Sequence, residues 1–191
     1  MRRASSSKTK SWHIALLRGI NVGGKNMLPM PELAKMFVAA GCEDVKSYIQ
    51  SGNVVFRAGD DVVSGLAGLI AGQIDERFGC RVPVVLRTAA ELVEVVRSNP
   101  FLKAGAAEDS LHVYFLAGMP AAGDVAGLDA GRSAPDAFAV VGREVFLQLP
   151  NGMARTKLTN AYFDSKLKTV STARNWRTVL KLLEMVGEAG R

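Results

Sequence analysis

Runs of apolar residues alternate with helical stripes along the first half of the chain. Residues 12–19, WHIALLRG, are an apolar run that ends at a glycine, as is typical of a buried strand. A helical stripe follows from Pro31 to Gly41, and two β-rich runs at 45–50 and 53–57 flank a Ser-Gly turn. This pattern predicts a strand, a helix and a hairpin, in that order.

A second helical stripe runs from Val62 to Phe78, and residues 82–87 have the pattern of another strand. The predicted order is therefore βαββαβ. This is the order of the ferredoxin-like split βαβ unit, in which two helices cover one face of a four-stranded antiparallel sheet. The sequence predicts an α+β fold whose N-terminal half, residues 12–88, is a ferredoxin-like subdomain.

The second half repeats part of this order. Its predicted elements are a helix at 89–97, a strand at 111–116, and a pair of strands at 138–141 and 144–149. The strings HIALLRG at 13–19 and HVYFLAG at 112–118 also share their pattern, so the second α+β half is interpreted as a decayed repeat of the first. Two helices are expected to close the chain, one from about Thr156 and one from about Thr172.

These elements divide the chain into four segments. They are a disordered basic tail at 1–11, the ferredoxin-like subdomain at 12–88, a second α+β subdomain at 89–150, and basic C-terminal helices at 151–191 that pack on the body. The composition, 48% hydrophobic and 22% charged, is that of an ordinary globular protein.

The net charge of +6 is concentrated at the two ends of the chain. Residues 1–10 carry four basic residues and no acidic residue, and residues 151–191 carry eight basic and three acidic residues. The only cysteines, Cys42 and Cys80, form no CxxC pair, which favours a reduced, cytoplasmic compartment. We also expect no signal peptide and no membrane span, because no apolar stretch is long enough.

The string GINVGGKN at 19–26 follows a strand and fits the spacing of a phosphate-binding P-loop. Asn26 lacks the hydroxyl that would bind Mg²⁺, and Pro29 and Pro31 place the helix start beyond Lys25. The string is therefore interpreted as an ordinary glycine loop. A weaker interpretation is that its amides form a concave anion site flanked by Arg18 and Lys25.

Other polar residues have a structural interpretation and a functional one. Ser51 and Asn53 are expected to shape the hairpin turn, with a ligand contact as the alternative. His13 and His112 fall inside predicted strands without ligands at metal spacing, so they are expected to pack within a sheet. The sequence assigns no catalytic residue, no metal and no cofactor.

The C-terminal segment holds two basic features. Thr156 is a candidate N-cap, and the helix start with Arg155 and Lys157 beside it would bind an anion. In the last predicted helix, basic residues line the polar face, which is either a solvated surface or a phosphate-binding stripe. These residues are Arg174, Arg177 and Lys181.

Four strings, RGINVGGKN, YIQSGNVVF, NGMARTKLTNAYF and TARNW, occur in this order and spacing. Together they resemble a widespread bacterial family, the domain of unknown function 1697 family. The resemblance runs from about Ile14 to Leu183 and implies the α+β, ferredoxin-like arrangement. It implies no activity, and no catalytic residue can be transferred from it.

The first functional hypothesis is a cytosolic protein that binds a phosphate-containing small molecule or a nucleotide, with an enzyme of unassigned reaction as one form of it. It rests on polar loops at strand ends, which are common places for sites. The expected pocket gathers Arg18, Asn21, Lys25, Ser51, Asn53, Arg155 and Lys157.

The alternative hypothesis is non-specific nucleic-acid binding through the basic termini. RNA-recognition domains share the βαββαβ order, but their strands carry aromatic residues for base stacking, and here only one phenylalanine lies on the two strings IALLR and NVVFR. A third interpretation is that the sheet face packs against the second half or against another copy of the chain. The pattern does not predict an oligomeric state.

Overall fold

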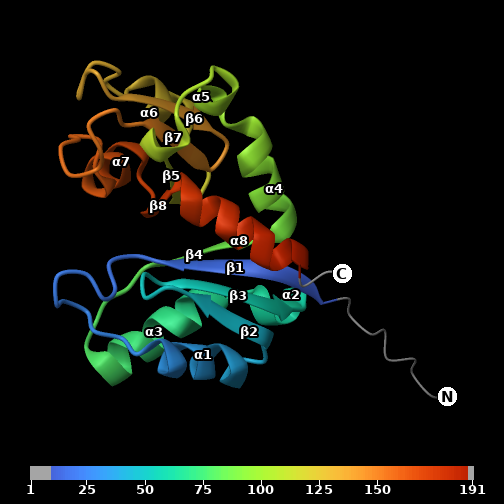
Figure 1. Cartoon of the computed structure of the whole chain (residues 1–191). Helices are drawn as coiled ribbons and strands as arrows, with labels where there is room; N and C mark the ends of the chain where they lie inside the picture. Colours follow the sequence, from blue (N-terminus) through green and yellow to red (C-terminus); the bar gives the residue numbers. More distant parts are fainter. Residues whose placement is uncertain (1–9, 189–191) are drawn as a thin grey trace.

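The computed structural model describes residues 10–188, which form a mixed α+β structure with two four-stranded antiparallel sheets (Figure 1). The first sheet has the order β2-β3-β1-β4 and the second has the order β6-β7-β5-β8. The strands are β1 Ser11–Leu17, β2 Glu43–Tyr48, β3 Asn53–Ala58, β4 Val84–Thr88, β5 Leu111–Leu116, β6 Ala137–Val141, β7 Glu144–Gln148 and β8 Ser171–Asn175.

Helices follow the strands in both halves. They are α1 Met30–Ala39, α2 Asp60–Val63, α3 Leu66–Phe78, α4 Ala89–Ser98, α5 Pro100–Lys103, the 3₁₀ helix η1 Glu108–Ser110, α6 Ala122–Ala126, α7 Asn160–Leu167 and α8 Trp176–Glu188. We call the first sheet with α1, α2 and α3 the first module, and the second sheet with α6 and α7 the second module. Helices α4 and α8 pack against each other, and Figure 1 shows α8 running between the two sheets.

The central strands of each sheet are buried on both faces, and their alternate residues point to opposite faces. In β1, Ala15 and Leu17 face α1 and α3, whereas Ile14 and Leu16 face the core that α4 and α8 share with the second sheet. In β5, the odd-numbered Leu111, Val113 and Phe115 join this shared core. Tyr114 and Leu116 pack with α7 on the outer face of the second sheet.

The second face of the first sheet is therefore not open to a nucleic acid. It packs against the second half of the chain, through a core that includes Val55 and Val85 of the first sheet, Phe146 of the second, and Trp176 and Leu182 of α8. This is the third interpretation of the sequence, and it removes the open-sheet surface that RNA-recognition domains use.

The pattern predicts the elements of the first module well, with one difference. The single helix expected from Val62 to Phe78 is divided into α2 and α3. Gly65 adopts the left-handed conformation between them, with φ of +84°, which glycine reaches without a steric penalty. The apolar stripe continues through this break, so periodicity alone did not detect it.

The segment from 151 onward differs more from the expectation, and both predicted helix starts are wrong. Helix α7 begins at Asn160 with Thr159 as its N-cap, not at Thr156. The helix expected from Thr172 is strand β8, which pairs with β5, and α8 begins only at Trp176. The expected domain boundary at residue 150 consequently divides the second sheet.

At the N-terminus, residues 1–9 of the expected basic tail lie outside the described residues. The expected tail is too long at its other end, since Ser11 is the first residue of β1. Lys10 donates a hydrogen bond to Glu43 of β2. Among residues 10–188, no helix is both long and apolar enough to cross a bilayer.

The two histidines pack within the sheets, as the sequence predicts. His13 in β1 is 3% exposed, its Nε2 lies 2.9 Å from the hydroxyl of Ser11, and its ring stacks on Phe56. His112 in β5 is half-buried, and its Nδ1 has no partner among the described residues. Burial lowers the pKa of both imidazoles.

The shared core predicts that the two modules unfold together. Leu182→Ala removes a fully buried side chain from this core and should lower the free energy of unfolding by about 2 to 5 kcal/mol. Urea unfolding followed by circular dichroism should give one transition at a lower midpoint. Val38→Ala on the exposed side of α1 is the control. Two transitions, with only one of them shifted, would contradict a shared core.

The buried histidines predict a loss of stability in mild acid. Because their pKa is lowered in the folded state, the unfolded chain binds more protons, so the free energy of unfolding should fall as the pH falls below about 6.5. The measurement is urea unfolding at several pH values for the wild type and for the double variant His13→Gln, His112→Gln. An equal fall in both proteins would assign the effect to other groups.

Candidate functional site

A buried arginine of the second sheet reaches into the strand ends of the first. Arg174 in β8 is 7% exposed. Its Nη2 donates to the carbonyl oxygens of Leu17, at 2.7 Å, and Gly52, at 3.1 Å, and its Nε donates to Oδ1 of Asn53 at 2.5 Å. The other acceptors are the Oγ1 of Thr172 and the carbonyl oxygens of Ala173 and Ser51. All six acceptors are neutral.

The Arg174 guanidinium therefore lies in the interior with its hydrogen bonds satisfied and without a carboxylate acceptor among the described residues. Burial lowers its pKa to about 10, so the group remains a cation at neutral pH. Neutral acceptors complete its hydrogen bonds, but they do not cancel its charge.

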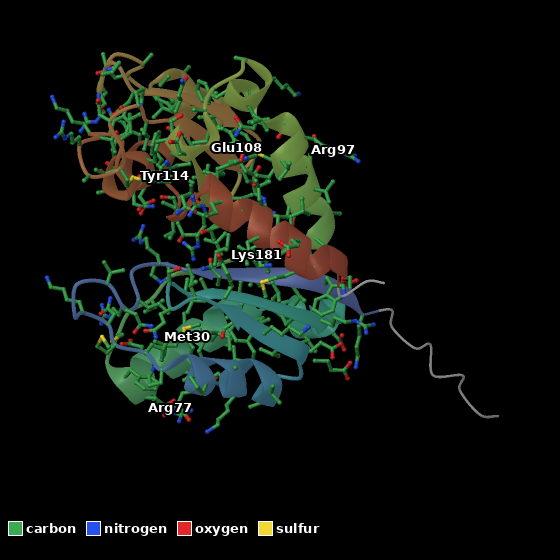
Figure 2. All side chains as sticks on the ribbon, viewed as in Figure 1. Met30, Arg77, Arg97, Glu108, Tyr114 and Lys181 are labelled. Atoms are coloured by element: carbon green, nitrogen blue, oxygen red, sulfur yellow. The ribbon has the colours of Figure 1, made fainter. Side chains whose placement is uncertain are left out.

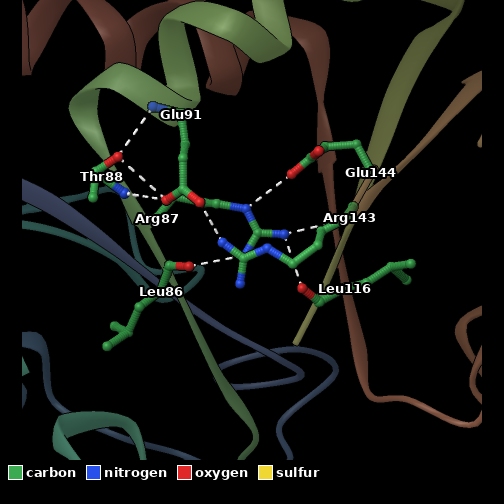
Figure 3. A network of polar contacts seen from close by, with 7 residues as sticks. All are labelled: Leu86, Arg87, Thr88, Glu91, Leu116, Arg143 and Glu144. Carbon is green, nitrogen blue, oxygen red and sulfur yellow. Dashed lines mark hydrogen bonds and ion pairs between the residues drawn. The ribbon is translucent and has the colours of Figure 1, made fainter. Parts of the chain in front are cut away.

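A second buried arginine makes the reciprocal contact (Figure 3). Arg87 in β4 is 1% exposed, and its Nη2 donates to the carbonyl oxygens of Leu116, at 2.8 Å, and Arg143, at 3.0 Å. Its Nε donates to Oε1 of Glu144 at 2.9 Å. Burial lowers the pKa of Arg87, and the carboxylate of Glu144 opposes this shift. Arg87 is thus a buried cation with a counterion.

The two arginines occupy equivalent positions in the two sheets. Each lies on the fourth strand of its module and reaches the last residue of the first strand and the hairpin turn of the other module. The Nε groups reach Asn53 and Glu144, which are the first residues of β3 and β7. At one end of the molecule the acceptor is therefore the Asn53 amide, and at the other end it is the Glu144 carboxylate.

Arg18, the residue after β1, forms an ion pair across the modules at the same end as Arg174. Its Nη1 donates to Asp164 of α7 at 2.5 Å and to the carbonyl oxygen of Ser171 at 3.0 Å. The other carboxylate oxygen of Asp164 accepts from the hydroxyl of Ser171 at 2.6 Å. The Arg18 side chain is 32% exposed, and its Nε and Nη2 donate to no described residue.

The charges at the two ends differ as a result. At the end shown in Figure 3, Arg87 and Arg143 face Glu144 and Glu91, so the cations and carboxylates balance. At the other end, Arg18 pairs with Asp164, and Arg174 has no carboxylate partner among the described residues, so two guanidinium groups accompany one carboxylate. We call this second group of three residues the Arg18 site.

The glycine loop beside the Arg18 site is held in place by Asn21. The Nδ2 of this side chain donates to the carbonyl oxygens of Leu28 and Gln50, each at 2.9 Å, and its Oδ1 accepts from the backbone amide of Leu28. Residues 22–25 form a tight turn that presents Lys25 to solvent, without a side-chain partner among the described residues. Helix α1 starts only at Met30, as the two prolines predict.

Ser51 and Asn53 brace the hairpin turn, as their structural interpretation predicts. Asn53 is fully buried, and its Nδ2 donates to the carbonyl oxygen of Tyr48 and to the hydroxyl of Ser51. Asn53 is not positioned to bind a ligand directly, because these bonds and the bond to Arg174 engage its amide.

Arg155 and Lys157 are exposed and lie in a loop, so the expected anion site at a helix start is wrong at this position. The amide of Lys157 donates to Ser133, and that of Leu158 donates to Thr156. Both basic side chains lack a partner among the described residues. In Figure 1 their loop, in orange, and the glycine loop, in blue, both lie at the left edge of the molecule, one on each module.

The basic stripe expected on the last helix is only partly present. Arg174 is not on α8 but in β8, and it is buried because β8 pairs with β5 between the two modules. Lys181 pairs with Glu184 on the same helix. Arg177 is exposed and has no partner among the described residues.

The structure thus brings Arg18, Ser51, Asn53 and Arg174 together and leaves Lys25, Arg155 and Lys157 on the surface. Sequence reasoning missed Asp164 and Ser171, which belong to α7 and β8. The only sequence feature that could have drawn attention to them is their position between two of the strings that resemble the family, NGMARTKLTNAYF and TARNW. Their spacing in the sequence does not link them to Arg18. Among residues 10–188, no cluster of histidine, cysteine and acidic side chains forms a metal site.

Two of three comparisons with known proteins found a match. A family model described as "Protein of unknown function (DUF1697)" matches residues 11–146. The solved structure of the conserved bacterial protein SP0830 from Streptococcus pneumoniae is similar, with a TM-score of 0.65 and 24% sequence identity over 93% of this chain and 99% of that chain. No curated protein matches the chain. At this identity the similarity establishes the fold alone.

The hydrogen bonds of Arg174 predict that its side chain is required for stability. Arg174→Met leaves the carbonyl oxygens of Leu17 and Gly52 without this donor, and should lower the free energy of unfolding by about 3 kcal/mol or more. Chemical denaturation measures the change. Arg177→Met, three residues further along and exposed, should change it by less than about 0.5 kcal/mol. Equal stability of the two variants would contradict the structural role of Arg174.

Proposed function

The chain belongs to the DUF1697 family of proteins of unknown function, and we propose that it binds a small phosphate-containing anion, such as a nucleotide, at the Arg18 site. The observation that carries the proposal is the buried cation Arg174, whose acceptors are all neutral, while the equivalent Arg87 has the counterion Glu144. An anionic ligand would supply the negative charge that this end lacks.

Arg18 is the residue that contacts the ligand in this proposal. Its Nε and Nη2 remain available after Nη1 has bonded Asp164 and Ser171, and two parallel N–H donors match a pair of phosphate oxygens. Lys25 adds a mobile ammonium from the glycine loop. Arg174 attracts the ligand through its charge and makes no hydrogen bond to it, because all of its N–H groups already donate to the protein.

Arg155 and Lys157 support the proposal less directly. They are cations without a partner among residues 10–188, on the second-module loop at the same edge of the molecule, so they raise the positive potential there and attract anions from solution. The proposal names binding and no reaction. The Ser171 hydroxyl is fully buried and donates to Asp164, which does not suit a nucleophile.

We also propose that each module is a ferredoxin-like split βαβ unit and that the second is a decayed repeat of the first. The matching strand orders support this proposal, as do the helices α4 and α8, which start directly after the fourth strand of each sheet. The reciprocal contacts of Arg87 and Arg174 support it further, because unrelated halves have no reason to share them.

A cytoplasmic location is part of the same proposal. Cys42 is buried, and burial raises the pKa of its thiol to about 11, so it is inert as a thiolate. Cys80 is partly exposed, and both cysteines are free, which suits a reducing compartment.

The test is isothermal titration calorimetry with inorganic phosphate, pyrophosphate and AMP. Arg18→Gln should weaken the binding of the best of these anions at least about tenfold, since a charged hydrogen bond contributes about 1.5 to 3 kcal/mol. Lys25→Gln should weaken it less. Lys46→Gln on β2, an exposed lysine outside the site, is the matched control and should bind as the wild type does.

The proposal fails if no anion binds, or if Arg18→Gln and Lys46→Gln bind equally well while their circular dichroism spectra match that of the wild type. The alternative, nucleic-acid binding through the basic termini, predicts a different outcome. A single-stranded oligonucleotide would then bind with a steep salt dependence, and removal of residues 1–10 would abolish that binding.

A further inference from the structure

A groove with a volume of about 530 Å³ is lined by residues other than the three of the Arg18 site. Its walls come from three elements that are distant in the sequence, β2 of the first module, η1 at the start of the second, and α8. This volume falls in the range of small-molecule sites, which is about 300 to 1,000 Å³.

The groove carries unpaired charges of both signs. Glu108 and Asp109 line it from η1, and neither carboxylate has a partner among the described residues. Arg177 lines it from α8 and is likewise unpaired. Lys181 and Glu184, also on α8, pair with each other at 2.5 Å and so contribute little net charge. Figure 2 labels Glu108 and Lys181 on their two elements.

Aromatic residues form the inner wall of the groove. Tyr48 contributes its ring from the end of β2, and Trp176 and Leu180 contribute from the first turns of α8. The Trp176 side chain is fully buried, and its indole Nε1 has no acceptor among the described residues. The indole is therefore covered by protein, and its N–H serves as a reporter of changes in the groove lining rather than as a ligand contact.

We infer that this groove binds a small zwitterion, an amino acid or short peptide with one ammonium and one carboxylate group. The ammonium group pairs with Glu108 and Asp109, and the carboxylate pairs with Arg177. An apolar or aromatic side chain of the ligand packs against Tyr48 and Leu180. This inference concerns a different surface and ligand class from the anion proposal and does not depend on it.

The equivalent groove at the other end of the molecule provides an internal comparison. It lies along α4, has a volume of about 250 Å³, and is lined by Val141 where the first groove has Tyr48. The correspondence follows from the hairpin registers, because Tyr48 pairs with Asn53 and Val141 pairs with Glu144. In the smaller groove, the charged residues Arg143 and Glu144 are already engaged in ion pairs. Only the larger groove combines space with unpaired opposite charges.

The experiment uses the full chain with Trp12→Phe, which leaves Trp176 as the only indole and gives a single indole N–H signal in a ¹H–¹⁵N spectrum. L-phenylalanine, L-leucine and L-glutamine are titrated as zwitterions, with phenethylamine and phenylacetate as analogues that each carry one charge. The inference predicts that at least one zwitterion shifts the Trp176 signal in a saturable way, with Kd below about 10 mM. Each singly charged analogue should bind at least about tenfold more weakly than L-phenylalanine, or not at all.

Variants then identify the two charged contacts. Arg177→Gln should remove the advantage of L-phenylalanine over phenethylamine, and Glu108→Gln with Asp109→Asn should remove its advantage over phenylacetate. Arg97→Gln on α4, an exposed arginine without a described partner, is the matched control and should leave every affinity unchanged. The inference is overturned if no zwitterion shifts the signal, if the analogues bind as tightly as the zwitterion, or if Arg177→Gln has no effect. Phosphate binding at the Arg18 site is measured separately, so failure of one proposal leaves the other standing.

Discussion

A buried guanidinium must find acceptors for all of its N–H groups, and in this protein most acceptors of each buried arginine come from the other module. Arg87 and Arg174 bond the carbonyl groups at the strand ends of the opposite sheet, where the sheet hydrogen bonds of those strands stop. Neither set of strand ends is complete by itself. The core that α4 and α8 share with both sheets also joins the two modules, so we expect them to fold as one unit.

The two ends of this reciprocal arrangement differ at one position, which is a glutamate at one end and an asparagine at the other. Glu144 neutralises Arg87, whereas Asn53 offers Arg174 an acceptor of similar shape without charge. The charges of the first end are therefore balanced, and the second end has more cations than carboxylates among its described residues. The grooves beside α4 and α8 differ in the same manner, since one is small with paired charges and the other is larger with unpaired charges.

The local pattern of apolar and polar residues predicted the strands of the first module, but it did not predict the elements of the C-terminal segment. Strands β1, β3 and β4 contain continuous apolar runs, and Arg18 and Asn53 could be placed at strand ends because a glycine or a tight turn marks each of those positions. Strand β8 contains only Ser171–Asn175, which has no clear apolar period, and its pairing with β5 is not local. Asp164 and Ser171 were missed because their contacts with Arg18 depend on that pairing.

The position of α8 in the chain has a consequence for biosynthesis. Among the described elements, β8 and α8 are the last to be made, yet they cover surfaces formed by some of the first. Until α8 has been made, the sheet face of Ile14, Leu16 and Val55 is only partly covered, because α8 supplies Trp176, Val179 and Leu182 to this core. Such a nascent intermediate is exposed to aggregation and is a natural client for chaperones during translation.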